Sequence, residues 1–219
     1  TKIQKHKITK ELNTLNEYLI YWSHSSRKGY SGTGLFTKLL PLNFSTGFGN
    51  PEFDCEGRIN IAEYFKFIYL NIYFPNGQKD DERLSYKLRF YDRCLEIMEE
   101  KRSLGKIILV GGDFNTAHHP IDLANPKENE KTSGFLPVER AWLDKIEKMG
   151  WIDTFRYFDK SPEQYTWWSY RTKARPRNVG WRLDYFWVNK EGIEHIKKAG
   201  IRQDIEGSDH CPVFVELEI

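Results

Sequence analysis

Hydrophobic and polar residues alternate at the end of the chain in the way that is typical of a β-strand with one buried face. Every second residue from Val213 to Ile219 is aliphatic, and glutamates occupy positions 216 and 218 between them. Three other segments are rich in β-branched and aromatic residues and also predict strands. They are residues 63–74, which stop at a Pro-Asn-Gly turn signal, residues 107–110, and residues 183–188.

Two segments show helical spacing instead. Residues 80–105 carry apolar side chains three and four positions apart and reach Gly105, a residue suited to ending a helix. Pro137 opens the second helix and Gly150 closes it. The predicted inner faces are Leu84, Leu88, Tyr91, Leu95 and Met98 in the first helix, and Val138, Trp142, Ile146 and Met149 in the second. Many strands with two inserted helices predict a layered α/β or α+β sandwich.

Composition limits the class of protein without identifying it. The 219 residues suit one domain with a sizeable core, and the formal net charge of +2 does not by itself indicate nucleic-acid binding. Cys55, Cys94 and Cys211 are scattered without CxxC spacing, which favours free thiols in a reducing compartment. The sequence has no signal-peptide pattern and no apolar run of about 18 residues. We therefore expect a cytoplasmic protein that makes no membrane contact, associated with the nucleoid if the source is bacterial or archaeal.

Polar side chains that could take part in chemistry follow one predicted strand and precede another. Asp113 and Asn115 come directly after the buried strand and point to the same side if the strand persists. They could bind a metal or orient a water, and the structural alternative is an Asx turn. Asp209 and His210 precede the last strand, and a turn residue beside a surface histidine is the structural alternative there. A zinc site at the adjacent His118 and His119 is not favoured, because adjacent side chains are expected to diverge.

A buried aspartate is expected in the strand at residues 183–188. Asp184 lies in an apolar extended segment, where an ionised carboxylate is costly to bury unless it is paired. A protonated His210 is one candidate partner, and such a pair suits a general base or a phosphate-binding group at neutral pH. A buried Asp184–Arg182 pair is the alternative.

Residues 170–182 form a locally basic segment in a nearly neutral chain. It has no acidic residue and stands beside three tryptophans, and cations interleaved with aromatic rings are typical of nucleic-acid contact. A solvated loop is the alternative for the charges alone. The cations are Arg171, Lys173, Arg175, Arg177 and Arg182, and the tryptophans are Trp167, Trp168 and Trp181.

The motifs YFPNG, GDFNTAHHPIDLANPKEN, SGFLPVER, NVGWRLDYF and GSDHCP resemble, in this order, those of the exonuclease III family of abasic-site endonucleases. This family is a branch of the endonuclease/exonuclease/phosphatase superfamily, and the resemblance covers essentially the whole chain. Related phosphatases share the Asp-x-Asn and Ser-Asp-His elements but not the WRLDY motif, so a phosphatase is disfavoured.

The resemblance implies an α/β fold, a four-layered sandwich of two mixed sheets packed face to face with helices outside. It also implies Mg²⁺-dependent hydrolysis of DNA, with Mn²⁺ as a substitute ion, 5′ to abasic sites and at 3′ ends. The implied catalytic residues are Tyr73, Asp113, Asn115, Asp184 and His210. The implied metal ligands are Asp209, Asp113 and Asn115. The implied DNA-binding residues are Tyr30, Asn76, Arg171, Arg175, Arg177, Trp167, Trp181 and Leu183.

The chain departs from the family pattern at its start. Thr1 and Lys2 match a family Thr-Lys pair that follows two strands, and those strands carry an active-site Asn and a metal-binding Glu. We therefore expect residues 1–219 to form a single, N-terminally incomplete domain that lacks the first two family strands. The expected partner is double-stranded DNA with abasic sites or 3′ ends. The family is monomeric, but open sheet edges could support a dimer. The alternative function is a weak or inactive domain that still binds abasic duplex DNA.

Overall fold

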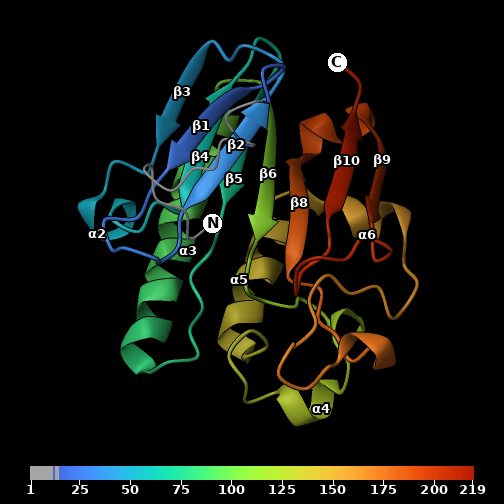
Figure 1. Cartoon of the computed structure of the whole chain (residues 1–219). Coiled ribbons are helices and arrows are strands. Elements are labelled where there is room, and N and C mark those ends of the chain that lie inside the picture. Colours follow the sequence, from blue (N-terminus) through green and yellow to red (C-terminus); the bar gives the residue numbers. More distant parts are fainter. Residues whose placement is uncertain (1–11, 13–14) are drawn as a thin grey trace.

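A six-stranded mixed sheet forms the centre of the computed structural model, which describes residue 12 and residues 15–219 (Figure 1). The strand order is β3-β4-β5-β6-β8-β7, and only β5 and β6 run parallel. The predicted strand over residues 63–74 is divided by a tight turn into the end of one strand and the whole of the next. The strands are β3 (Asn43–Thr46), β4 (Ile59–Glu63), β5 (Phe67–Ile72), β6 (Ile107–Asp113), β7 (Trp151–Asp153) and β8 (Asp184–Asn189).

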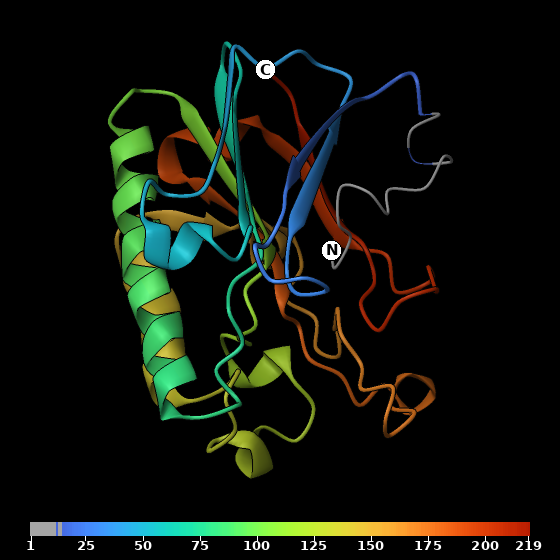
Figure 2. The same ribbon diagram turned by 60° about the vertical axis from the view of Figure 1, so that its left-hand side comes forward.

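Two antiparallel strand pairs lie on one face of this sheet. One pair is β1 (Leu19–Ser23) with β2 (Thr33–Thr37), and the other is β9 (Ile196–Ile201) with β10 (Val213–Leu217). The long helices α3 (Asp81–Arg102) and α5 (Pro137–Lys148) cover the opposite face (Figure 2). Short elements complete the described chain: α2 (Pro51–Asp54), α4 (Pro126–Asn129), α6 (Thr154–Phe158), η2 (Pro120–Asp122), η3 (Arg175–Arg177) and η4 (Lys190–His195).

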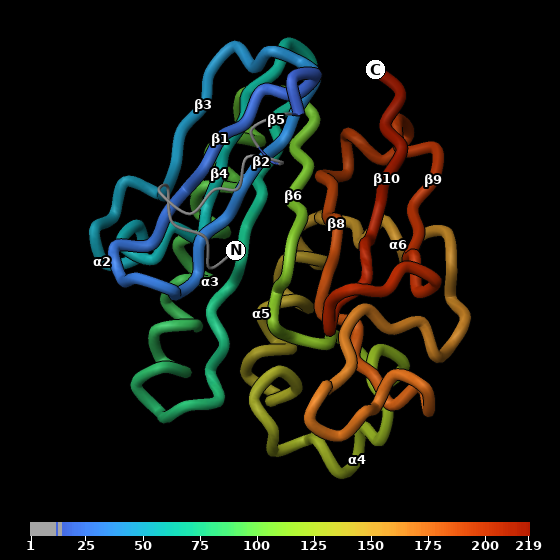
Figure 3. The backbone as a smooth tube through the Cα atoms, viewed as in Figure 1, coloured from blue at the N-terminus to red at the C-terminus, as the bar shows by residue number. Residues whose placement is uncertain are grey.

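This arrangement confirms an α/β fold with mixed strand pairing and helices. In the described part of the chain the second layer is two separate strand pairs, because β2 and β10 are not hydrogen-bonded neighbours. The tube trace shows the two pairs over different parts of the sheet (Figure 3). The complete four-layered sandwich and the absence of two family strands stay predictions, and Thr1 and Lys2 lie outside the described residues.

Aromatic side chains fill the core between the sheet and the two long helices. Phe74 stacks on Phe114 with ring centroids 4.2 Å apart, and Tyr91 of α3 stacks on Trp142 of α5 at 4.4 Å. The predicted inner face of the second helix is partly wrong, because Val138 and Met149 are exposed. The buried stripe of α5 is Glu139, Trp142, Leu143 and Ile146. Glu139 can be buried there because its carboxylate pairs with the buried ammonium group of Lys87.

A buried ion network fixes the segment that precedes β8. Arg182 is fully buried and donates two hydrogen bonds to Asp122, at 2.8 and 3.0 Å. Arg156 donates to the same carboxylate at 2.7 Å, and Asp153 lies 2.7 Å from Arg182. Although burial acts to raise it, the positive charges of Arg182 and Arg156 hold the pKa of Asp122 well below its usual range. Arg182 is therefore committed to Asp122 and Asp153 rather than to Asp184.

Two expectations from composition can be compared with the described residues. All three cysteines are free thiols, with Cys94 and Cys211 buried. No helix in the described part of the chain is both long enough and apolar enough to span a bilayer.

We predict that Asp122→Asn lowers the free energy of unfolding by about 3–5 kcal/mol, because it leaves the buried guanidinium groups with one anion too few. Urea unfolding followed by tryptophan fluorescence measures the change. The matched control is Asp204→Asn, which removes an exposed pair with Arg202 and should leave the free energy of unfolding almost unchanged. Equal losses in the two variants would show that the buried network is not a stabilising anchor.

Candidate active site

Two aspartates face each other where β6 ends and β8 begins. Asp113 and Asp184 are register partners in this antiparallel pair, and both side chains are mostly buried. Gly112 precedes Asp113 with a φ of 139°, and a Cβ at this position would collide with the carbonyl of Ile72 on β5. The glycine thus lets β6 approach β5 closely and brings the Asp113 carboxylate to the rim of the sheet.

His210 lies against both carboxylates. Its Nδ1 is 2.8 Å from Asp184 Oδ2, and its Nε2 is 3.9 Å from Asp113 Oδ2. Burial acts to lower the pKa of His210, but the hydrogen bond to Asp184 and the negative charges of Asp184, Asp113 and Asp209 raise it to about 9. The imidazole is therefore a cation at neutral pH, with Nδ1–H bonded to Asp184 and Nε2–H available to a ligand.

The pKa of the Asp113 carboxyl group is also raised, which makes its carboxylate a stronger base. Burial and the negative charge of Asp184 raise the pKa of Asp113 to about 7, against the lowering effect of His210. A carboxylate with this pKa can accept a proton near neutral pH. Two carboxylates and one imidazole thus lie within 4 Å of one another through His210.

Asn115 follows Asp113 in a turn, so the Asx turn named as the structural alternative is present. The strand ends at Asp113, and Asn115 has a positive φ of 51°. Its backbone N–H donates to Asp113 Oδ1 at 2.8 Å, which is an Asx turn, and its side-chain Nδ2 donates to Asp113 Oδ2 at 3.2 Å. Asn76 donates to Asn115 Oδ1 at 3.0 Å. The Asx turn and a chemical site are therefore compatible, because the turn fixes the carboxylate.

Tyr73 borders the same site. The guanidinium of Arg58 lies 4.4 Å from the centre of its ring and donates to the Tyr73 carbonyl at 2.9 Å. Burial and the charge of Asp113 raise the pKa of the Tyr73 hydroxyl. The phenol therefore stays neutral and can donate a hydrogen bond.

A pocket of about 490 Å³ lies over these polar groups. Trp167, Trp181 and Leu183 form an apolar part of its lining, backed by buried Leu123 and Phe135. Backbone pairing between Trp167 and Trp181 and between Trp167 and His210 joins the apolar wall to the imidazole. Asn115, Asn76, Asp113, Asp209, His210 and Tyr73 line the polar part. The structure thus brings together ten of the residues that the sequence analysis selected, counting Asp184 behind His210.

The oxygen atoms of Asp113 and Asp209 are the groups in this pocket that fit a hard divalent cation. Mg²⁺ takes oxygen ligands and can be bound through one or two carboxylates, with water completing its shell. Asp209 Oδ2 also accepts a hydrogen bond from Trp167 Nε1 at 3.2 Å, which orients the carboxylate. Asn115 suits a metal less well, because Asn76 already donates to its carbonyl oxygen.

The predicted cationic contacts divide into two groups. Arg175 lies 4.6 Å from the Trp168 ring and donates to the carbonyls of Gln203 and Ile205 at 2.9 and 2.6 Å. Arg177 donates to the Thr172 carbonyl at 3.0 Å. Arg171 and Lys173 are exposed, and neither side chain has a hydrogen-bond partner among the described residues.

Tyr30 lies outside the pocket that holds His210. It lines a neighbouring pocket of about 460 Å³ with Arg27, Lys79 and Arg83, and Asn76 borders both pockets. The ring is 5.1 Å from the Arg27 guanidinium. A long polymer that crosses Asn76 could therefore contact both pockets.

The sequence analysis missed the residues that hold the Asn115 turn. Lys87 of α3 is fully buried, and its ammonium donates to the Asn115 carbonyl at 2.8 Å and to Glu139 at 2.6 Å. Glu139 in turn accepts from the backbone N–H groups of Gly134 and Leu136. The signal was present, because Lys87 lies between Leu84 and Tyr91 on the apolar face of the predicted helix.

Comparison with known proteins gives a consistent family assignment. The model of a family described as Endonuclease/Exonuclease/phosphatase family matches residues 4–210. An exodeoxyribonuclease of Bacillus subtilis is 40% identical over 204 residues, which are 93% of this chain and 81% of that protein. A DNA-(apurinic or apyrimidinic site) endonuclease of Dictyostelium discoideum is 38% identical over 222 residues. That match covers 100% of this chain and 61% of that protein. The crystal structure of the Xenopus laevis APE2 catalytic domain is 28% identical and superposes with a TM-score of 0.88, over all of this chain and 82% of that one.

We predict that His210 titrates at a pKa of about 9 in the metal-free chain. Asp184→Asn should lower this pKa, because the anion that stabilises the protonated ring is lost. Titration of the imidazole Cε1–H by NMR in the presence of EDTA measures it. Asp204→Asn, which changes an exposed carboxylate elsewhere, should leave the His210 pKa unchanged. A His210 pKa near 6.5 in the parent, or one insensitive to Asp184→Asn, would contradict the assigned ion pair.

Proposed function

Because the chain belongs to the endonuclease/exonuclease/phosphatase family and is similar to its exonuclease III-like abasic-site endonucleases, we propose that it is a DNA repair nuclease. It hydrolyses the phosphodiester 5′ to an abasic site and acts at DNA 3′ ends as an exonuclease and phosphodiesterase. Residues 1–219 act as one domain. The observation that carries the proposal is the imidazolium–carboxylate group of His210, Asp184 and Asp113 at a pocket walled by two indole rings.

In this proposal the scissile phosphate binds at His210. The imidazolium donates from Nε2 to a non-bridging oxygen, while Asp184 holds Nδ1 and so fixes the ring. The neutral Tyr73 hydroxyl supplies a second donor. Both donors are in place before charge develops on the phosphate, which is the condition for electrostatic stabilisation of the transition state.

The attacking water is activated by Asp113. The carboxylate takes a proton from the water as its oxygen attacks phosphorus, and the 3′ oxygen of the preceding nucleotide leaves. Asn115 and the Asx turn keep the carboxylate in one orientation. Asn76 donates a hydrogen bond to Asn115 and contacts phosphate beside the scissile bond.

Mg²⁺, with Mn²⁺ as a substitute, completes the site in this proposal. Asp209 and Asp113 would hold the ion, with Asn115 as a weaker candidate ligand because its carbonyl oxygen is engaged. When bound, the ion supplies positive charge that stabilises the phosphate and the leaving oxygen.

Selectivity for abasic DNA follows from the apolar wall. Trp167, Trp181 and Leu183 accept a deoxyribose that has rotated out of the duplex, and extrusion costs least where no base is paired. The exposed cations Arg171 and Lys173 contact the DNA backbone, and Tyr30 contacts it from the neighbouring pocket. Arg175 and Arg177 act on DNA indirectly, by shaping the loop that carries these cations.

A binding domain with little or no activity is the second candidate. It is favoured by the small number of metal-binding groups, because Asp113 and Asp209 are the two carboxylates that line the pocket in the described part of the chain. The same cleavage assay separates the two functions.

We predict that the parent chain cuts a labelled duplex with one abasic site when Mg²⁺ is present and not when EDTA replaces it. His210→Ala should reduce the single-turnover rate by about 10²–10⁴-fold while circular dichroism stays unchanged. His195→Ala, which alters an exposed histidine away from the pocket, is the matched control and should cut at the parent rate. Binding of the duplex without cleavage by the parent would establish the second candidate instead.

We predict that Trp181→Ala reduces the preference for abasic over intact duplex, because it opens the apolar wall. Competition binding with the two duplexes under the same salt measures the preference. An unchanged ratio would exclude Trp181 from recognition.

We predict that Arg171→Ala and Lys173→Ala each flatten the dependence of log affinity on log salt by about 0.9, the value for one lost phosphate contact. Arg175→Ala should change the slope less and lower the melting temperature more, because its partners are carbonyls of its own chain. Fluorescence anisotropy at several salt concentrations gives the slopes. Equal slopes in the parent, Arg171→Ala and Lys173→Ala would show that this segment is a solvated loop that does not contact phosphate.

A further inference from the structure

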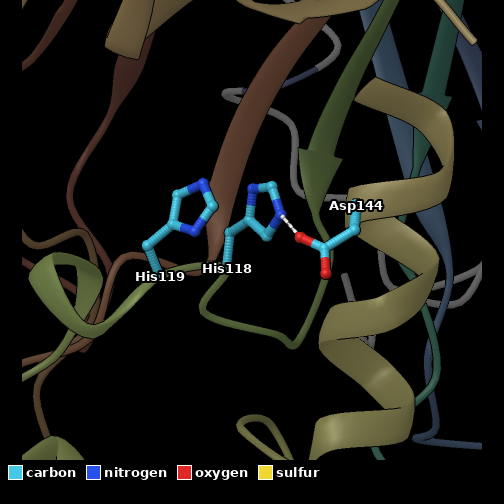
Figure 4. Close-up of side chains that lie close together, drawn as sticks. All are labelled: His118, His119 and Asp144. Atoms are coloured by element: carbon cyan, nitrogen blue, oxygen red, sulfur yellow. Dashed lines mark hydrogen bonds and ion pairs between the residues drawn. The ribbon is translucent and has the colours of Figure 1, made fainter. Parts of the chain in front are cut away.

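His118, His119 and Asp144 form a compact cluster outside the pocket that holds His210 (Figure 4). The two histidines follow the Asn115 turn, and Asp144 projects from the middle of α5. His118 Nε2 is 2.8 Å from Asp144 Oδ1. One ligand atom from each of the three side chains lies within 4.8 Å of the others.

The expectation that the adjacent histidines diverge is wrong. Their rings stack with centroids 3.7 Å apart and planes inclined by 25°. The backbone explains this, because the His118 N–H donates to Tyr185 Oη at 3.1 Å and the His119 N–H donates to Asp122 Oδ2 at 3.0 Å. Both donors are thus held by the buried polar network that anchors the start of β8, and the two rings lie on one side of the segment.

We propose that His118, His119 and Asp144 bind a divalent transition-metal ion, with Zn²⁺ as the representative ion. Two imidazole nitrogens and one carboxylate oxygen are the donors that suit Zn²⁺ and related ions, whereas Mg²⁺ prefers oxygen alone. Three protein ligands leave one tetrahedral position for water or another ligand.

The geometry requires only small side-chain movements. Zn–N and Zn–O bonds of about 2.0–2.2 Å place tetrahedral ligand atoms about 3.4 Å apart. The ligand atoms here lie within 4.8 Å, so rotation of the exposed side chains can close the set. Coordination would replace the hydrogen bond between His118 and Asp144, because the two atoms that form it, Nε2 and Oδ1, would both bind the ion.

The cluster has a fixed inner side and a route for the ion. His118 is buried, its backbone N–H is held by Tyr185, and its Nε2 faces Asp144. The Asp144 side chain is 49% exposed, and His119 is half-buried. The cluster is therefore anchored on its inner side and open to solvent on its outer side.

Metal binding would tie α5 to the segment that follows the Asn115 turn. His118 contacts Tyr185, which is the neighbour of Asp184 along β8. An ion here would thus stiffen the support of the proposed active site without lining it. This inference does not depend on nuclease activity, because binding of the ion is measured directly.

The test is isothermal titration of Zn²⁺ into the EDTA-treated and dialysed chain, in buffer with excess Mg²⁺. We expect one Zn²⁺ per chain at this cluster. His119→Ala and Asp144→Asn should each weaken binding by at least about tenfold. His195→Ala is the matched control and should bind as the parent does.

Two further measurements test whether Zn²⁺ binds at this cluster and not elsewhere on the chain. Asp209→Asn should retain Zn²⁺ binding, which separates this cluster from the pocket near His210. Zn²⁺ should raise the melting temperature of the parent but not that of His119→Ala, since an ion that binds the folded chain stabilises it. Equal Zn²⁺ affinity in the parent and His119→Ala, or loss of binding in Asp209→Asn, would overturn the proposal.

Discussion

The close approach of two carboxylates at the ends of β6 and β8 is the constraint on which the site depends. Strand register brings Asp113 opposite Asp184, and neither can leave without breaking the ladder that joins the two halves of the sheet. Like charges in a poorly hydrated place raise the pKa of at least one partner. A cation between them relieves the repulsion, and His210 is that cation. The raised pKa values of Asp113 and His210 follow from this one arrangement.

Two buried ion networks support the arrangement from either side. Lys87 and Glu139 join α3 and α5 to the Asn115 turn. On the other side, Asp122 and Arg182 hold the segment that leads into β8. Buried charges of this kind add little net stability, but removal of one member is costly, so they fix a conformation. The backbone of the site is therefore rigid before any substrate arrives.

The second network also determines which partner Asp184 takes. A sequence that places Arg182 two residues before Asp184 leaves an Asp–Arg pair open as an alternative. In the structure the guanidinium turns to the other face and meets Asp122, which is distant in sequence. Asp184 is thus left for His210, and chemistry becomes available because a structural ion pair forms elsewhere.

Local patterns allowed much of the fold to be predicted. The strand β10, the helix α3 and the end of the strand at Ile72 follow from residues close in sequence, and each lies where it was expected. The motifs also identified the residues that line the pocket near His210. Their roles in catalysis and DNA binding stay proposals.

Features that depend on distant contacts were not predicted. The sequence does not reveal whether a cationic side chain faces solvent or a carbonyl, so the hydrogen bonds of Arg175 to its own chain were not predicted, and its role in DNA binding stays a proposal. Adjacent histidines stack because a buried tyrosine and a buried aspartate hold their backbones. The strand expected at residues 107–110 extends to Asp113, where the Asx turn that was left open as an alternative begins.

We propose above that Asp184 acts through His210 on the scissile phosphate. The decisive experiment is single-turnover cleavage of an abasic duplex by Asp184→Asn, with duplex affinity measured in the same buffer. We expect a rate at least about 100-fold below that of the parent, with affinity changed by less than about tenfold, because the oriented imidazolium is lost while the pocket remains. Cleavage by Asp184→Asn at the parent rate would show that Asp184 does not act on the phosphate through His210.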